Sequence, residues 1–194
     1  MTDSLRRELR QIESVLSQTI GRDSRWNGEV IITDNPGIRG AKPFRCAIVI
    51  NAALANIDVR WRTLIHELLH TYSVGYDSQS YQEFRGWEEG VIEQLQRQLR
   101  PAILDQLNIA VVEEAFVQEE IEHVYTNYIA ALETLRKALK AETLPFYLDL
   151  LGTAIFLRPV RVLNRGLELE SDQRQEYWSA FAAANTVLKR RILT

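Results

Sequence analysis

The opening of the chain predicts an amphipathic helix, because apolar side chains recur every three to four positions over residues 4–20. Two stretches rich in β-branched residues come next, at residues 28–33 and 44–51, and each predicts a strand. Between them, residues 34–37 (Asp-Asn-Pro-Gly) predict a turn, since proline fixes one backbone angle and glycine accepts an unusual one. Strand-like sequence ends near residue 54.

From residue 58 onward the spacing of apolar residues is helical. Helices are expected at residues 58–72, 86–99, 111–141, 145–156 and 172–192. Pro101, Pro145 and Pro159 stand at plausible breaks between them. This order predicts an α+β fold, in which a small N-terminal β-sheet and the helix at 58–72 precede a mostly helical C-terminal half. No stretch long enough to be a linker divides the chain, so residues 1–194 are expected to form a single domain.

Composition and charge narrow the classes of partner. Hydrophobic residues make up 46% of the 194 residues and charged residues 25%, which is typical of a soluble folded protein. The net charge of -3 gives no global basic field that would favour nucleic acid.

The most apolar stretch, residues 146–157, contains Asp149 and is too short to span a bilayer. The charged N-terminus lacks the apolar core of a secretory signal. We therefore expect a cytoplasmic protein without a nucleic-acid or membrane partner.

Two of the three histidines lie four residues apart in the helix expected at 58–72. His66 and His70 share one helical face, while Leu64, Ile65 and Leu68 are among the apolar residues on the opposite side. Two imidazoles held in this way can bind one metal ion, with Zn–N bonds of about 2.0–2.1 Å. Glu67 is at the flank of that face, so the segment has the pattern His-Glu-x-x-His, in which zinc lowers the pKa of a bound water and the glutamate takes its proton. The plainer alternative is two surface histidines on an ordinary helix.

A catalytic zinc site takes three protein ligands, so a third must come from elsewhere in the chain. Glu89, in the helix expected at 86–99, is one candidate. Its neighbour Glu88 is another, because it falls in the middle of the apolar stripe of that helix, where an acid is costly unless it is paired or bound to metal. Cys46, the single cysteine, is more typical of a small buried hydrophobe. These residues alone leave Glu88 and Glu89 both open.

The motif together with its downstream glutamate resembles the gluzincins, a family of zinc peptidases with thermolysin-like and aminopeptidase-like branches. The resemblance covers residues 44–96 and rests on His66, Glu67 and His70, and on Glu89, which follows after 18 intervening residues and precedes a glycine. It implies one Zn2+ held by His66, His70 and Glu89, with Glu67 as the general base. It also implies that Glu93 accepts a hydrogen bond from a ligand histidine, and it prefers Glu89 to Glu88 as the ligand.

The same resemblance implies further parts of a zinc metallopeptidase. The strand at 44–51 would form the rim of the cleft and bind an extended peptide through its backbone, and Tyr125, or else His123, would stabilise the oxyanion from a long helix. Residues 1–100 would be the catalytic core and residues 101–194 a helical extension. The expected partner is a peptide or protein substrate, and no particular oligomeric state is indicated.

Two other classes of function stay open. One is a catalytically inactive module with a zincin-like fold that keeps zinc for binding or regulation. Glu67 argues against it, because a purely structural zinc site needs no general base. The other is a helical interaction protein that binds no metal.

Overall fold

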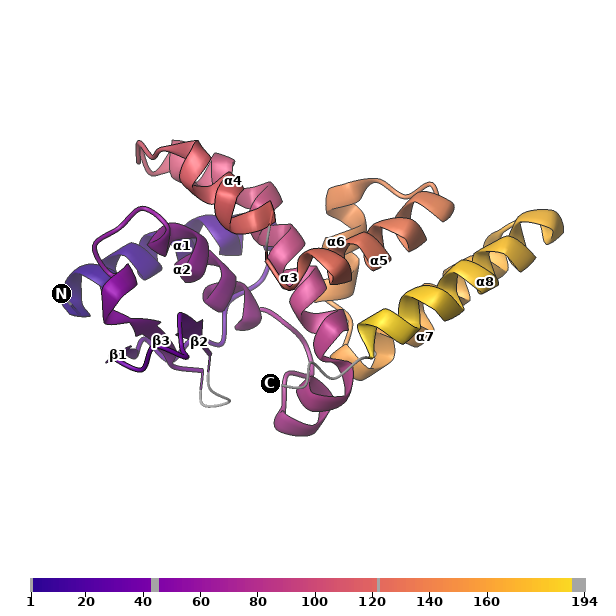
Figure 1. The fold of residues 1–194 in the computed structure, drawn as a ribbon, viewed down its shortest axis with the longest axis horizontal. Coiled ribbons are helices and arrows are strands. Elements are labelled where there is room, and N and C mark those ends of the chain that lie inside the picture. Colours follow the sequence, from indigo (N-terminus) through magenta and orange to yellow (C-terminus); the bar gives the residue numbers. More distant parts are fainter. Residues whose placement is uncertain (1, 43–45, 122, 190–194) are drawn as a thin grey trace. The chain divides into compact units, whose positions relative to one another are not determined.

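A computed structural model describes residues 2–42, 46–121 and 123–189 (Figure 1). It confirms the α+β prediction: a small three-stranded sheet lies near the N-terminus, and helices make up most of the remaining chain. The described elements are α1 (Thr2–Ile20), β1 (Val30–Thr33), β2 (Gly40–Ala41), β3 (Ile48–Asn51), α2 (Arg60–His70), α3 (Ser78–Gln106), α4 (Glu113–Ile121), α5 (Thr126–Ala138), α6 (Thr143–Leu151), α7 (Arg158–Arg165) and α8 (Ser171–Leu188).

The chain divides into two compact units. The first consists of Met1–Tyr72 and Gln96–Glu122, and the second of Ser73–Leu95 and His123–Thr194. The expectation that the whole chain folds as a single domain stays a prediction.

The first unit is built around β3, the middle strand of the sheet. β3 pairs in parallel with β1, with Val30 opposite Ile48, and antiparallel with β2, with Gly40 opposite Ile50. All four β3 side chains are buried, and α1 and α2 contact the sheet and each other. The hydroxyl groups of Tyr72 and Ser17, 2.8 Å apart, connect the end of α2 to α1.

The strand expected at residues 44–51 differs from β3 in where it begins. β3 begins at Ile48, and residues 43–45 lie outside the described part of the chain. β3 is the middle strand: β1 pairs with all four of its residues, and β2 pairs with Val49 and Ile50. That the strand expected at 44–51 binds an extended peptide through its backbone stays a prediction. β2 was not expected from the sequence, because two residues are too few to show the alternation by which a strand is recognised.

Three predictions about helices are corrected, and one helix was not predicted. The helix expected at 86–99 begins earlier and ends later, as α3, and contains a non-helical backbone at Phe84. Pro101 lies inside α3 rather than at a break. The helix expected at 111–141 is two helices, α4 and α5, and no proline or glycine marks the gap between them. α7 was not expected at all.

Pro101 is tolerated inside α3 because the buried face of the helix continues beyond it. Leu99 precedes the proline, Ile103 and Leu104 follow it, and all three are at least nine-tenths buried, while Pro101 itself faces solvent. A proline inside a helix costs about 3 kcal/mol. Burying three large aliphatic side chains contributes more, at roughly 1.5–3 kcal/mol each.

The second unit is helical and depends on close contacts between segments distant in the sequence. α5 and α8 pack along each other, and α7 contacts α8. The indole nitrogen of Trp87 donates to the side-chain oxygen of Asn185 over 3.1 Å, and the hydroxyl of Tyr147 donates to Glu133 over 3.0 Å. These contacts place Trp87, and with it the glutamates that follow in α3, in the interior of the unit.

Gly40 lets β2 pass close to α2 in the first unit. A Cβ atom at this position would stand 2.4 Å from Cγ2 of Thr63 and 3.0 Å from both Cγ and Oε1 of Glu67. A side chain here would therefore collide with the helix that carries the two histidines.

We predict that Gly40→Ala lowers the free energy of unfolding by about 1–3 kcal/mol, the usual cost of overpacking. Thr63→Ser in the same background removes the methyl group nearest to the new Cβ and should recover part of the loss. Gly37→Ala is the control, because a Cβ there would come no closer than 3.3 Å, to the side chain of Asn35 in an exposed turn. Equal losses in Gly40→Ala and Gly37→Ala, measured by urea unfolding, would show that β2 does not lie against α2 in this way.

Candidate metal centre

The two histidines lie on α2, a helix whose residues from Trp61 to His70 are all buried. His66 is 6% exposed and His70 is 3% exposed. Their ring centroids are 5.0 Å apart with the ring planes at 75°, so both imidazoles project from the same face of the helix. Buried leucines on the other side fix the helix, and the imidazoles have little freedom to move away from each other.

Glu89 of α3 completes a group of three possible metal ligands. One ligand atom from each of His66, His70 and Glu89 lies within 4.8 Å of the other two, and all three residues are buried. A tetrahedral ion with bonds of about 2 Å holds its ligand atoms roughly 3.3 Å apart. With separations of up to 4.8 Å, the three residues could hold a metal ion.

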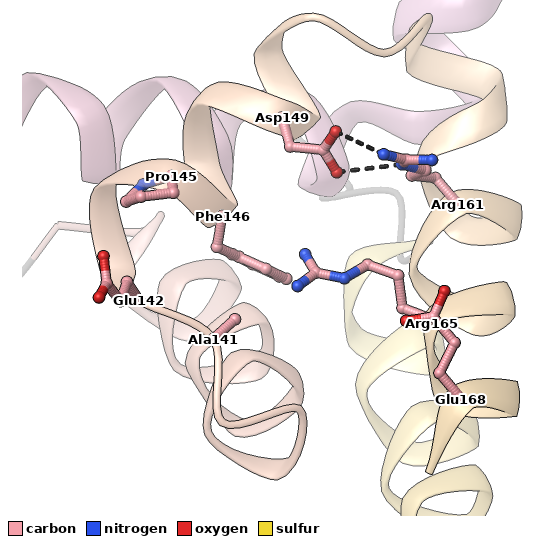
Figure 2. Close-up of a pocket in the computed structure, with 8 residues that line it drawn as sticks. All are labelled: Ala141, Glu142, Pro145, Phe146, Asp149, Arg161, Arg165 and Glu168. Carbon is pink, nitrogen blue, oxygen red and sulfur yellow. Dashed lines mark hydrogen bonds and ion pairs between the residues drawn. The ribbon is translucent and has the colours of Figure 1, made fainter.

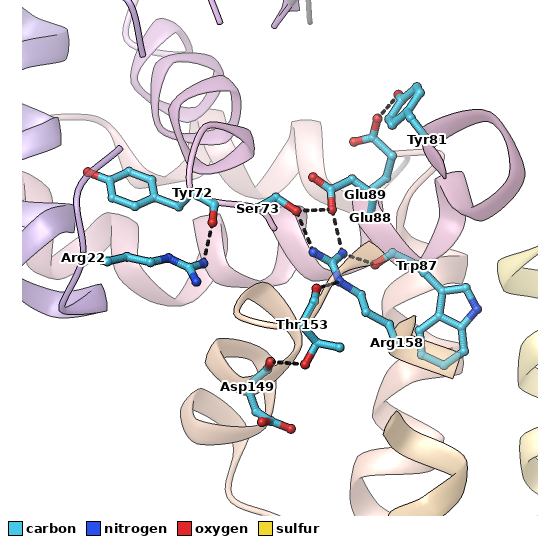
Figure 3. Close-up of polar contacts among 10 residues, drawn as sticks. All are labelled: Arg22, Tyr72, Ser73, Tyr81, Trp87, Glu88, Glu89, Asp149, Thr153 and Arg158. Atoms are coloured by element: carbon cyan, nitrogen blue, oxygen red, sulfur yellow. Dashed lines mark hydrogen bonds and ion pairs between the residues drawn. The ribbon is translucent and has the colours of Figure 1, made fainter. Parts of the chain in front are cut away.

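Glu88, the alternative ligand, is held in a separate network in the second unit (Figure 3). Nη1 of Arg158 lies 2.6 Å from Oε2 of Glu88, and neither side chain is exposed. The hydroxyl of Ser73 donates to the same oxygen over 2.7 Å and accepts from Nη2 of Arg158 over 2.7 Å. The guanidinium also donates to the backbone carbonyls of Trp87 and Thr153. Glu88 thus has its own cation, and it is not a member of the group formed by His66, His70 and Glu89.

Burial lowers the pKa of Arg158, and the charge of Glu88 opposes that effect. A guanidinium does not lose its proton in a protein, so the two side chains form a true ion pair. The pair connects α7 to the turn of α3 that also carries Glu89.

Tyr81 is a residue of the site that was not predicted from the sequence. Its hydroxyl donates a hydrogen bond to Glu89, as Figure 3 shows. Burial and the negative charge of Glu89 raise the pKa of Tyr81 well above its usual value, so the hydroxyl keeps its proton and stays a donor. Tyr81 lies eight residues before Glu89 with the non-helical backbone at Phe84 between them, so regular helical spacing could not have identified it.

Two other residues predicted for the site, Glu67 and Glu93, lie on the same helices as members of the group. Glu67 is buried on α2 and lies beside Gly40 of β2. Glu93 is fully buried one turn after Glu89. That Glu67 is a general base, and that Glu93 holds a histidine, stay predictions.

Tyr125 and His123 lie in the connection between α4 and α5 instead of on a long helix. The two rings meet edge to face with centroids 4.7 Å apart, and Tyr125 also stacks on Tyr128 at 5.9 Å. The hydroxyl of Tyr125 interacts with Arg85, a residue of α3. An oxyanion-binding role for either residue stays a prediction.

A cavity of about 480 Å³ lies elsewhere in the second unit, between α6 and α7 (Figure 2). Asp149 on its wall forms an ion pair with Arg161, and the guanidinium of Arg165 lies 5.6 Å from the ring centroid of Phe146. The lining includes no histidine or cysteine, and its net charge is slightly negative. These groups give no reason to connect the cavity with the metal ligands.

Comparison with known proteins gives no family for this chain: no protein-family model matches it, and neither a curated protein nor a solved structure is significantly similar to it. The likeness to gluzincins therefore rests on the motif residues and on the group they form. Among the described residues, no helix is both long and apolar enough to cross a membrane.

We predict that Arg158→Met lowers the free energy of unfolding by about 3–5 kcal/mol, because it leaves the carboxylate of Glu88 buried without its cation. Adding Glu88→Gln should recover part of this loss, since it removes the uncompensated charge. The control is Arg161→Met, which breaks an ion pair whose side chains are 54% and 31% exposed and should cost no more than about 1 kcal/mol. If urea unfolding finds the two arginine variants equally stable, the buried pair does not stabilise the fold in this way.

Proposed function

We propose that this protein is a zinc-dependent metallopeptidase. The single observation that carries the proposal is the meeting of His66, His70 and Glu89, three buried side chains whose ligand atoms lie within 4.8 Å of one another. Glu89 lies on a different helix from the two histidines, with 18 residues between it and His70, so the meeting of the three is not a trivial result of helical spacing.

The chemistry of these donors fits zinc. Imidazole nitrogen and carboxylate oxygen are both common zinc ligands, and two histidines with one glutamate is a set used by catalytic sites. Structural zinc sites close the shell with four protein ligands, usually cysteines among them. In the described part of the chain the group offers three ligands, and Cys46 is not one of them. A three-ligand set supports a catalytic site, which keeps one position for water.

When bound, zinc supplies a water of lowered pKa and polarises the carbonyl of the peptide bond. The protein residues have separate tasks. Glu67 takes the proton from the attacking water and delivers it to the leaving amine. The Tyr81 hydroxyl donates to one carboxylate oxygen of Glu89 and so fixes its orientation. The buried Arg158–Glu88 pair fixes the helical turn from which Glu89 projects.

We expect protein purified without a histidine tag to contain one zinc per chain by elemental analysis, and to lose it when Glu89 is replaced. Glu89→Gln should weaken zinc binding by more than the roughly 10–100-fold that loss of an outer hydrogen-bond partner typically causes. Glu83→Gln is the matched control on the same helix, because Glu83 is exposed and accepts a hydrogen bond from the side chain of Gln79. Zinc affinities that are the same in both variants would remove Glu89 from the ligand set.

We expect Glu67→Gln to keep its zinc and to hydrolyse a quenched-fluorescence peptide library about 10²–10⁴-fold more slowly than the unaltered protein, the usual contribution of a general base. Glu67 lies beside the metal ligands but is not one of them in this proposal. Zinc binding without any turnover in the unaltered protein would instead favour the inactive zinc-containing binding or regulatory module. Absence of zinc binding would leave only the helical interaction protein.

A further inference from the structure

Arg85 is a partly buried cation one helical turn before Glu89, on the same face of α3. Its guanidinium carbon lies 5.8 Å from the ring centroid of Tyr81, the residue that donates to Glu89. The guanidinium has a hydrogen bond with Tyr125 and interacts with the charge of Glu89, but among the described residues no direct ion pair joins it to a carboxylate. Arginine is the residue best suited to bind a carboxylate or phosphate. Its Nε is buried and has no hydrogen-bond partner within the described part of the chain.

Tyr128 lies in the same place and supplies a second polar side chain. Its side chain is at least nine-tenths buried, and its hydroxyl has no hydrogen-bond partner among the described residues. Burial raises the pKa of Tyr128 and Glu89 adds to that effect, while the nearby Arg85 opposes it. A hydroxyl that keeps its proton is available to donate to an anion.

Gly90 brings this tyrosine close to the metal ligand. A Cβ at Gly90 would stand 3.0 Å from Cβ of Tyr128, so the start of α5 passes directly against the residue that follows Glu89. Tyr125 stacks on Tyr128, and its hydroxyl interacts with Arg85. One guanidinium and two phenol groups therefore gather beside Glu89, all within the second unit.

We propose that Arg85, Tyr125 and Tyr128 bind the C-terminal carboxylate of the substrate, so that the enzyme is a carboxypeptidase that removes one or two residues. This inference rests on the proposed function, since it places the carboxylate relative to the zinc held by Glu89. Arginine presents a planar fork that matches a carboxylate in two parallel hydrogen bonds, and a phenol adds a third.

The spacing suits a short leaving group. Four residues of α-helix span about 6 Å, and one residue of extended peptide spans about 3.3–3.6 Å. The separation of Arg85 and Glu89 along the helix axis is therefore comparable to the length of one or two residues of extended peptide. In the reaction the water oxygen bonds to that carbon, the C–N bond breaks, and the released amine takes the proton that Glu67 removed from the water.

The test compares peptides that differ only at the C-terminus. Zinc-loaded Glu67→Gln protein is titrated in a calorimeter with an acetylated tripeptide acid, the same tripeptide as its amide, and an amide with glutamate as its last residue. We expect the acid to bind at least tenfold more tightly than the plain amide. Equal affinities for the acid and the plain amide would overturn the proposal. Tighter binding of the glutamate amide than of the acid would also overturn it, and would show that Arg85 binds an acidic side chain of the peptide instead of its C-terminus.

Variants then identify the groups responsible. Arg85→Met should abolish the preference for the acid, Arg85→Lys should keep part of it, and Tyr128→Phe should reduce it several-fold without changing the affinity for the amide. Arg161→Met, remote from Glu89 in the sequence and paired with Asp149, should leave the preference intact. A preference unchanged in Arg85→Met would overturn the assignment, and if that variant does not fold, Arg85→Lys and Tyr128→Phe decide.

Failure of this inference and failure of the proposed function give different results. If the unaltered protein cleaves acids and amides equally well, the peptidase proposal stands and the carboxylate site is wrong. If it prefers the acid in titration yet cleaves no peptide, the carboxylate site stands and the catalytic proposal is wrong.

Discussion

The structure depends on how α3 accommodates negative charge in the interior. Glu88, Glu89 and Glu93 are all buried in less than two turns of this helix. A carboxylate removed from water is costly unless a cation or several donors compensate it. Glu88 is compensated by Arg158 and Ser73, whereas Glu89 meets the hydroxyl of Tyr81 and two imidazoles. The neighbouring residues Glu88 and Glu89 thus differ in role because different side chains face them: Arg158 faces Glu88, and Tyr81 and two histidines face Glu89.

The group formed by His66, His70 and Glu89 could be predicted well from the sequence because most of its geometry is local. His66 and His70 are four residues apart, and any regular helix turns two such side chains to the same face. Glu89 was harder, since nothing local separates it from Glu88. The apolar stripe correctly indicated that Glu88 is buried, but burial alone does not distinguish a metal ligand from an ion pair. The deciding partner, Arg158, is 70 residues away in the sequence.

The errors in the predicted fold have the same cause. They arise from contacts between residues far apart in the sequence, which the local spacing of apolar residues does not reveal. Pro101 continues a helix because buried leucine and isoleucine residues on both sides outweigh one lost hydrogen bond. β2 is too short to show the alternation of apolar and polar residues that marks a strand. Its position is set by pairing with β3 and by its close approach to α2, which Gly40 permits.

Arg85 and Tyr128 lie in different helices, and neither has an unusual sequence context. The sequence could not show that the Nε of Arg85 and the hydroxyl of Tyr128 are buried without a hydrogen-bond partner among the described residues, because that depends on how α3 and α5 pack.

The central position of β3 limits how the protein can hold a long, extended chain. A guest strand must find free backbone donors and acceptors along an edge, and the edge beside Glu67 belongs to β2, which has only two residues. Such a short edge provides few backbone hydrogen bonds, so affinity has to come from the ends and side chains of the guest. For the proposed peptidase, the β2 edge therefore gives little support to processive threading of an unfolded polypeptide. Such threading relies on repeated contacts with the backbone that do not depend on sequence.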